Sequence, residues 1–258
     1  MQQEEKKNKV ARRFVELDVL RGFAILLMSL YHLVFDLVAY FNIPLNLYPD
    51  GIWWYVGRGS ALLFMLISGM SSTLGKSSFK RGAIVLGCGL IVTLFSLPVM
   101  GENYVRFGIL HFFGAAMILK ALFEKIVKSP KVRFAVAVVL VPLSWWLGKV
   151  TESTMIKGPW LLPIGIAYPG FTSFDYYPLF PWLGVFAAGV VLGMLVYKNK
   201  RALLALDITQ KQESAPREAA RQGLRPLAFL GRHSLLVYLV HQPLILGALY
   251  LIHFAGLL

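Results

Sequence analysis

Seven runs of apolar residues, each about as long as a bilayer is thick, constrain the fold of this chain more than any other feature. An α-helix needs about 20 predominantly apolar residues to cross the hydrocarbon core of a membrane. The pattern predicts spans at residues 17–41, 53–75, 81–100, 106–127, 132–148, 178–198 and 233–255. These spans use more than half of the 258 residues. The sequence therefore predicts an all-α, polytopic membrane bundle of about seven helices, with no room for a separate soluble domain of ordinary size.

The distribution of basic residues predicts the orientation of this bundle. Charged residues make up only 15% of the chain, and the net charge is +13. In the N-terminal tail, the connecting segments and the ends of the spans, 21 Lys and Arg residues fall on one side of the membrane and three on the other. Cytoplasmic loops collect Lys and Arg, so the N-terminus is expected inside and the C-terminus outside a cell membrane. The same rule accounts for the positive charge, and we expect no nucleic-acid partner.

The chain divides into a short tail and one membrane domain. Residues 1–13 are expected to be a cytoplasmic charged tail, and residues 14–258 a single transmembrane domain. Residues 149–177 combine Gly, Pro and aromatic residues, which is typical of an outer loop at the membrane surface. Residues 199–226 form a basic cytoplasmic segment, either a helix at the lipid surface or a solvated linker. The single cysteine, Cys88, excludes a disulfide framework and a thiolate metal site, and no metal is expected.

Ionisable residues within the spans are the first candidates for function, because burying them in lipid costs a few kcal/mol. His32 and Asp36 share one helix face, so Asp36 could orient His32 as a general base and stabilise its charged form. In the alternative reading, Asp36 neutralises Arg58 and His32 bonds to a neighbouring helix. His32, Asp36, Arg58 and His111 fall at a similar depth in the outer half of the membrane, and Asp175 lies just outside the sixth span. This convergence predicts one polar cavity. We predict catalytic roles for His32, Asp36 and His111.

Other polar residues are candidates for substrate binding. Arg21 follows Asp18 by one turn, so it forms either a helix-end ion pair or a contact with the phosphates of a cytosolic donor. His241 and Gln242 precede Pro243, where a proline leaves a helix carbonyl without its usual donor. These two residues either cap the broken helix or contact substrate. We predict substrate-binding roles for Arg21, Arg58, Asp175, His241 and Gln242.

Four motifs give the chain a family resemblance. Residues 17–28 (LDVLRGFAILLM) and the following His32 resemble the opening signature of integral-membrane O-acyltransferases, in which an Arg-Gly pair precedes an essential His at this spacing. Residues 107–114 (FGILHFFG), 175–184 (DYYPLFPWLG) and 230–243 (LGRHSLLVYLVHQP) are similar to the group of the heparan-alpha-glucosaminide N-acetyltransferase catalytic domain, which includes small bacterial proteins. The combination is more specific than any one motif.

The resemblance implies a membrane acyltransferase. It would move an acyl group, usually acetyl from acetyl-CoA, across the membrane to an amine or hydroxyl that is commonly on a sugar. The expected partners are acyl-CoA, a sugar or glycoconjugate acceptor and the lipid bilayer, with a homodimer as a candidate assembly. Acetyl-CoA would be the donor substrate, and no covalently bound cofactor is expected. A route through an acyl-histidine and a direct transfer both stay open.

Two functions from other classes also fit intramembrane Asp and His residues. A proton-coupled transporter of a small solute places such residues mid-membrane, although transporters usually show internal repeats and this sequence has none that we detect. A b-type haem protein needs paired histidines on facing helices. The candidates for such a pair are His32, His111 and His241.

Overall fold

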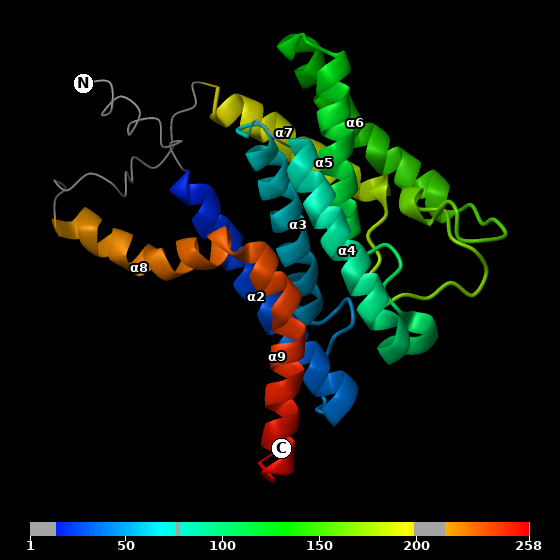
Figure 1. Cartoon of the computed structure of the whole chain (residues 1–258), viewed down its shortest axis with the longest axis vertical. Helices are drawn as coiled ribbons and strands as arrows, with labels where there is room; N and C mark the ends of the chain where they lie inside the picture. Colours follow the sequence, from blue (N-terminus) through cyan, green and yellow to red (C-terminus); the bar gives the residue numbers. More distant parts are fainter. Residues whose placement is uncertain (1–13, 76–77, 199–214, 258) are drawn as a thin grey trace. The chain divides into compact units, whose positions relative to one another are not determined.

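The computed structural model describes residues 14–75, 78–198 and 215–257 and is built from α-helices (Figure 1). Two short 3₁₀ turns, η1 and η2, cover Gly101–Asn103 and Leu162–Ile164. The α-helices are α2 (Val15–Phe41), α3 (Ile52–Ser72), α4 (Ser78–Met100), α5 (Ile109–Ile126), α6 (Pro130–Glu152), α7 (Leu179–Val196), α8 (Ala215–Arg232) and α9 (Ser234–Phe254). All seven apolar runs of the sequence thus lie on helices.

Five of the described helices are long and apolar enough to cross a membrane: α2, α4, α6, α7 and α9. The all-helical prediction is confirmed, and the chain is a multi-pass membrane protein. Helices α3 and α5 are not among the helices whose length and apolar composition are sufficient for a membrane span. The count of seven spans and their orientation stay predictions.

The chain forms two compact units that divide within α3, between Leu63 and Phe64. The first unit holds α2, the first part of α3, α8 and α9, and the second holds the rest of α3 and α4 to α7. The predicted tail, residues 1–13, lies outside the described residues, as do residues 199–214 of the predicted basic segment. The remainder of that segment is helical, in α8.

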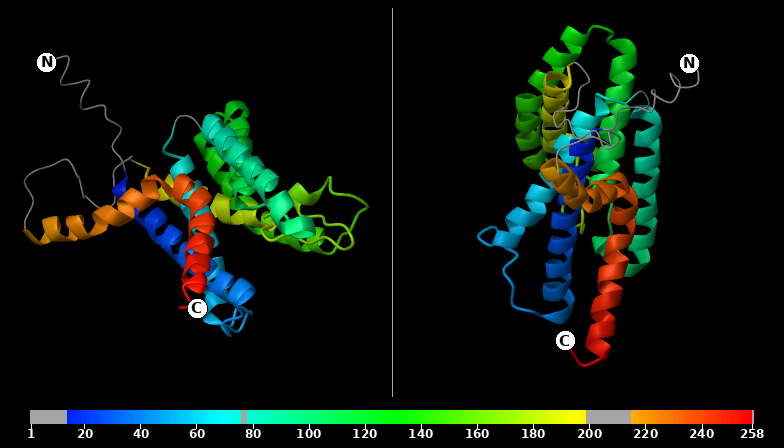
Figure 2. Two further views of the ribbon diagram at one scale, coloured as in Figure 1. Left: turned by 60° about the horizontal axis from the view of Figure 1, so that its bottom comes forward. Right: turned by 90° about the vertical axis from the view of Figure 1, so that its left-hand side faces the viewer.

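Close backbone contacts hold α2 and α8 together in the first unit (Figure 1). A Cβ on Gly22 would meet the carbonyl of Leu227, and a Cβ on Gly231 would meet the carbonyl of Asp18. Small residues are what allow two membrane helices to approach this closely. Helix α9 follows α8 after His233 and runs beside α2, as Figure 2 shows from two further sides. This packing brings the polar residues of α9 to those of α2.

In the second unit, α4 packs on α5 and α6 packs on α7. Ser144 of α6 joins α7 by two hydrogen bonds, donating to the carbonyl of Pro181 and accepting from the amide of Gly184, each at 2.9 Å. The predicted outer loop begins later than expected, because α6 continues to Glu152. Within that loop, Tyr176 forms an isolated β-bridge with Phe107, the residue that precedes the start of α5 by two positions.

Candidate active site

Four of the predicted site residues lie together on α2 and α9 in the first unit, and we call them the α2–α9 polar cluster: His32, Asp36, His241 and Gln242. Gln242 donates from Nε2 to Oδ1 of Asp36 at 2.7 Å. The rings of His32 and His241 are 4.9 Å apart between centroids. Asp36 is fully buried, and His241 is 8% exposed. The first and last apolar runs of the sequence thus meet through polar side chains.

The hydrogen bond of His241 fixes the tautomer of its ring. Its Nδ1 lies 2.6 Å from the carbonyl oxygen of Tyr238. A carbonyl oxygen only accepts, so Nδ1 carries the proton, and the neutral ring has a lone pair on Nε2. That Nε2 is buried and has no hydrogen-bond partner in the part of the chain that the structure describes. The backbone therefore holds this imidazole with a basic nitrogen unused.

Three buried atoms of the cluster lack a donor among the described residues: Oδ2 of Asp36, Nε2 of His241 and Oε1 of Gln242. All three are acceptors, because Gln242 already uses its amide nitrogen on Asp36. A buried acceptor without a donor costs about 1–3 kcal/mol, and native structures keep few of them. The cluster is therefore complementary to a group that brings several donors, such as an amine or a hydroxyl.

The hydrogen bonding of His32 differs from the arrangement proposed from its spacing to Asp36. Gln242, on another helix, supplies the donor to Oδ1 of Asp36, and a hydrogen bond to a carboxylate is among the strongest that an amide can make. No hydrogen bond of His32 occurs among the described residues. Its ring instead packs against Tyr31, edge to face at 5.6 Å, and against His241. The catalytic role of His32 stays a prediction.

The contact between the two imidazoles also bears on the haem hypothesis. A bis-histidine haem lies between its two axial rings. His32 and His241 pack directly against one another, which leaves no gap for a macrocycle between them. Within the described ranges, no group of three or more His, Cys, Asp or Glu residues could hold a metal ion.

A second charged group lies near the start of α2. Asp18 pairs through Oδ1 with Nη1 of Arg21 at 3.0 Å and through Oδ2 with Nε of Arg232 at 3.5 Å. The predicted Asp18–Arg21 ion pair is thus present. Arg232 was not identified from the sequence, although it stands in the motif at residues 230–243. Two guanidinium groups share one carboxylate, so these three side chains keep a net positive charge.

His111 in the second unit has both ring nitrogens occupied by the protein. Its Nδ1 accepts from the amide of Gly108 at 3.2 Å, and its Nε2 lies 3.2 Å from Oγ1 of Thr93. The Thr93 hydroxyl donates to the carbonyl of Val105 at 2.7 Å, so it accepts from Nε2–H of the ring. Neither nitrogen keeps a free lone pair. This geometry favours a structural role at the start of α5 over the predicted catalytic one.

Asp175 also caps the start of α5. Its Oδ2 accepts the backbone N–H of Ile109 at 2.9 Å, which satisfies one of the unpaired donors of the first helical turn. Burial of the carboxyl group raises the pKa of Asp175 to about 6, against the opposing effect of that hydrogen bond. Arg106 to Gly108, expected to begin the fourth span, precede the helix, because the carbonyl of Phe107 pairs with the amide of Tyr177 at 2.9 Å.

The remaining candidate, Arg58, lies over the ring of Trp54 at 4.6 Å from its centroid in the first unit. His111 and Asp175 belong to the second unit, whereas the α2–α9 polar cluster, Arg21 and Arg58 belong to the first. The single polar cavity that the sequence predicts would contain residues of both units. It stays a prediction.

Comparison with known proteins places the chain in a family. Searches among curated proteins and among solved structures gave no match. A family model described as "Heparan-alpha-glucosaminide N-acetyltransferase, catalytic" matches residues 13–243. That range includes all four sequence motifs, the α2–α9 polar cluster and the Asp18–Arg21–Arg232 group. The chain therefore belongs to the heparan-alpha-glucosaminide N-acetyltransferase catalytic family of membrane acetyltransferases.

Proposed function

We propose that this chain transfers an acetyl group from acetyl-CoA on the cytoplasmic side to an amine or hydroxyl of a sugar on the outer side of the cell membrane. The observation that carries the proposal is the set of three buried acceptors without donors in the α2–α9 polar cluster. Family membership supports membrane acetyltransferase chemistry in general. The three buried hydrogen-bond acceptor atoms support an amine or a hydroxyl as the group that is acetylated.

An attacking amine or hydroxyl complements this cluster. Its N–H or O–H groups can donate to Asp36, His241 and Gln242, the residues whose buried acceptor atoms lack donors. Such bonds orient the nucleophile, and orientation is a large part of the rate gain in a transfer between two substrates. We assign to His241 and Gln242 the positioning of the acceptor group.

We assign proton removal to His32. As the nucleophile attacks the thioester carbonyl, a new C–N or C–O bond forms and the C–S bond breaks. The proton of the nucleophile passes to an imidazole nitrogen of His32, and the departing thiolate then takes up a proton to become the CoA thiol. A base placed in this way contributes roughly 10²–10⁴-fold to rate. His241 lies against His32 and offers a second basic nitrogen.

The donor end of the proposed reaction rests on Arg21 and Arg232. The guanidinium groups converge on Asp18, which holds them near one another. Arg binds phosphate oxygens through pairs of hydrogen bonds, and CoA carries several phosphates. Arg21 and His32 are 11 residues apart on α2, or about 16 Å along the helix. The flexible pantetheine arm of CoA is the part that would cover this distance.

The experiment for this proposal is an acetyl-transfer assay on the purified chain. Protein in detergent is incubated with acetyl-CoA labelled in the acetyl group, with and without sugar extracts from membranes. We expect label to appear in a sugar fraction together with stoichiometric free CoA thiol. Release of label only as free acetate, or no release with any amine or hydroxyl acceptor, would contradict the proposal.

A further inference from the structure

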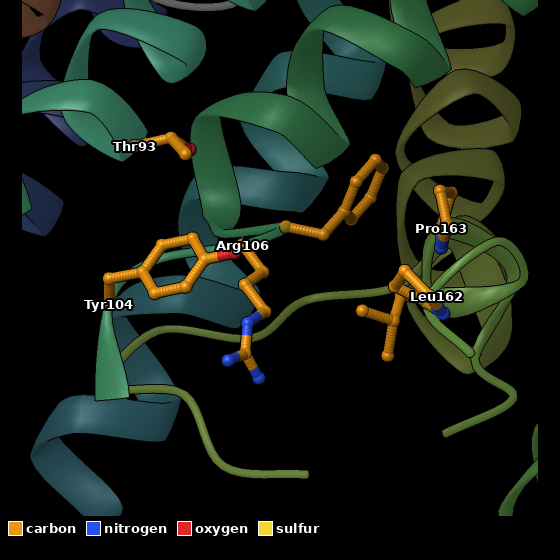
Figure 3. Close-up of a pocket in the computed structure, with 7 residues that line it drawn as sticks. Thr93, Tyr104, Arg106, Leu162 and Pro163 are labelled. Carbon is orange, nitrogen blue, oxygen red and sulfur yellow. The ribbon is translucent and has the colours of Figure 1, made fainter. Parts of the chain in front are cut away.

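A pocket of about 230 Å³ lies in the second unit, and none of its lining residues has a step in the proposed reaction. Its wall is formed by the segment before α5 and by the loop between α6 and α7, together with one residue of α4 (Figure 3). The lining residues are Thr93, Tyr104, Arg106, Phe107, Pro159, Leu162 and Pro163. Arg106 is the charged residue of this lining.

The guanidinium group of Arg106 is held in place from several sides. Its Nη1 donates to the carbonyl of Thr172 at 3.1 Å, and its Nη2 donates to the carbonyl of Glu102 at 3.2 Å. Three aromatic rings lie within cation–π distance of it: Tyr104 at 4.6 Å, Phe171 at 5.4 Å and Tyr168 at 5.7 Å. In Figure 3 the group projects between Tyr104 and Leu162. Its orientation is therefore set before any ligand arrives.

These partners fix the guanidinium group without neutralising it. Carbonyl oxygens and ring faces carry only partial negative charge, and Arg106 forms no ion pair with the described residues. A guanidinium has five N–H donors in a planar fork, and the two carbonyl bonds leave some of them unused. The two hydrogen bonds of the guanidinium group are solvent-exposed, so an anion can reach its unused donors directly.

The other residues that line the pocket indicate which charge its ligand carries. Phe107, Pro159 and Leu162 offer no charge, so Arg106 sets the charge preference of the pocket. The Thr93 hydroxyl donates its proton to Val105 and does not offer it to a ligand. The Tyr104 hydroxyl could bond to a neutral sugar, but a carboxylate or phosphate would in addition gain a charge-assisted, fork-shaped contact with Arg106.

We propose that this pocket binds an anionic oxygen group, carboxylate or phosphate, through Arg106. Two sources share this chemistry, an acidic sugar and the headgroup of an anionic lipid. The proposal for this site does not depend on the proposed acetyl transfer. It is argued from other residues, and its test measures binding and not turnover. It would stay valid if the chain acetylated nothing.

The test measures binding to the purified full-length chain by equilibrium dialysis and by thermal shift. The soluble probes are inorganic phosphate, glucuronate and uncharged glucose. In a second arm the chain is placed in nanodiscs of neutral lipid or of neutral lipid mixed with anionic lipid. The variant is Arg106→Gln. The matched control is Lys149→Gln, which removes an exposed cation that also lies over an aromatic ring, Trp145 at 5.6 Å, outside the pocket.

We expect saturable binding of phosphate and glucuronate but not of glucose, at least tenfold weaker in Arg106→Gln and unchanged in Lys149→Gln. Stabilisation by anionic nanodiscs alone, lost in Arg106→Gln, would support the site and identify a lipid headgroup as the source. If Arg106→Gln fails to fold, Arg106→Lys, which keeps the charge but loses the planar fork, takes its place in the same comparison. Equal responses to charged and neutral probes, or an equal loss in both variants, would overturn the proposal.

Discussion

At the scale of single residues, the bond between Gln242 and Asp36 is what keeps a fully buried carboxyl group in the α2–α9 polar cluster. A carboxyl group without any donor in such a place would carry the full desolvation cost. Gln242 supplies one donor and leaves Oδ2 available. The pair therefore stabilises the cluster and still leaves one acceptor atom without a donor among the described residues.

Replacing Gln242 by Leu should destabilise the folded chain. The substitution removes the donor to Asp36, and hydrogen bonds to charged groups contribute about 1.5–3 kcal/mol. The same substitution should cost less when Asp36 is already Leu, because no carboxyl group is then left unpaired. Thermal unfolding of the two single variants and the double variant measures this coupling. Additive effects would show that the two side chains do not depend on each other.

A pH dependence is expected from Asp175. Its folded pKa of about 6 lies above the ordinary value of 3.8, so the folded chain binds this proton more tightly than the unfolded chain does. The resulting stabilisation is complete below about pH 4 and is lost as the pH rises through about 6. Melting temperatures of the wild-type chain should therefore fall between pH 4 and pH 7 more than those of Asp175→Asn, whose amide does not titrate. Parallel curves would assign the fall to other groups.

The residues of the cluster could be predicted from the sequence, but their pairing could not. A polar residue within an apolar run stands out by itself, which is the signal that predicts His32, Asp36, His241 and Gln242 as site residues. Spacing along one helix favours a His32–Asp36 contact, whereas the donor to Asp36 comes from 206 positions away in the sequence. Arg106 had a weaker signal, as one of three basic residues on the predicted outer side.

At the scale of helices, the close contact between α2 and α8 sets where α9 begins. Gly231 lies against the backbone of Asp18, and α9 begins three residues later, at Ser234. The glycines of this contact are needed because a side chain would meet backbone atoms, which cannot move aside. Asp18 is at the same time the residue that holds Arg21 and Arg232. The contact therefore couples helix packing to the proposed donor site.

Gly231→Ala should destabilise the chain, whereas Gly223→Ala should not. A Cβ at Gly231 meets the Asp18 carbonyl, and overpacking of this kind costs about 1–3 kcal/mol. A Cβ at Gly223, on the same helix, meets nothing within 4 Å, and Ala is favoured over Gly in a helix by up to about 1 kcal/mol. Thermal unfolding of both variants in one detergent is the measurement. A Gly231→Ala chain as stable as Gly223→Ala would show that α2 and α8 do not touch there.

Helix existence follows from the sequence more readily than helix ends do. Apolar runs predicted each of the seven hydrophobic helices, because length and composition are properties of the segment itself. The start of α5 at Ile109 depends on Asp175, which lies 66 residues away and caps its first turn. Such a cap comes from tertiary contact, so the sequence pattern placed the start at residue 106 instead.

At the scale of the whole molecule, the proposed reaction needs donor and acceptor to reach the chain from opposite sides of a membrane. The charge distribution predicts which side is cytoplasmic, and it can be tested with single cysteines in a Cys88→Ser background. Lys128→Cys, in the exposed link between α5 and α6, should resist a membrane-impermeant thiol reagent applied to intact cells. Thr154→Cys, exposed after α6, should react. The reverse pattern would invert the orientation.

The most direct measurement of the central claim is acetyl transfer by His32→Ala beside His253→Ala. His32 belongs to the α2–α9 polar cluster, whereas His253 lies near the end of α9 against Phe41. Both variants are first compared with the wild-type chain for melting temperature, and transfer from labelled acetyl-CoA is then measured. We expect a loss of at least about 10²-fold in His32→Ala and little change in His253→Ala. A folded His32→Ala chain with near-normal turnover would contradict the assignment of proton removal to His32.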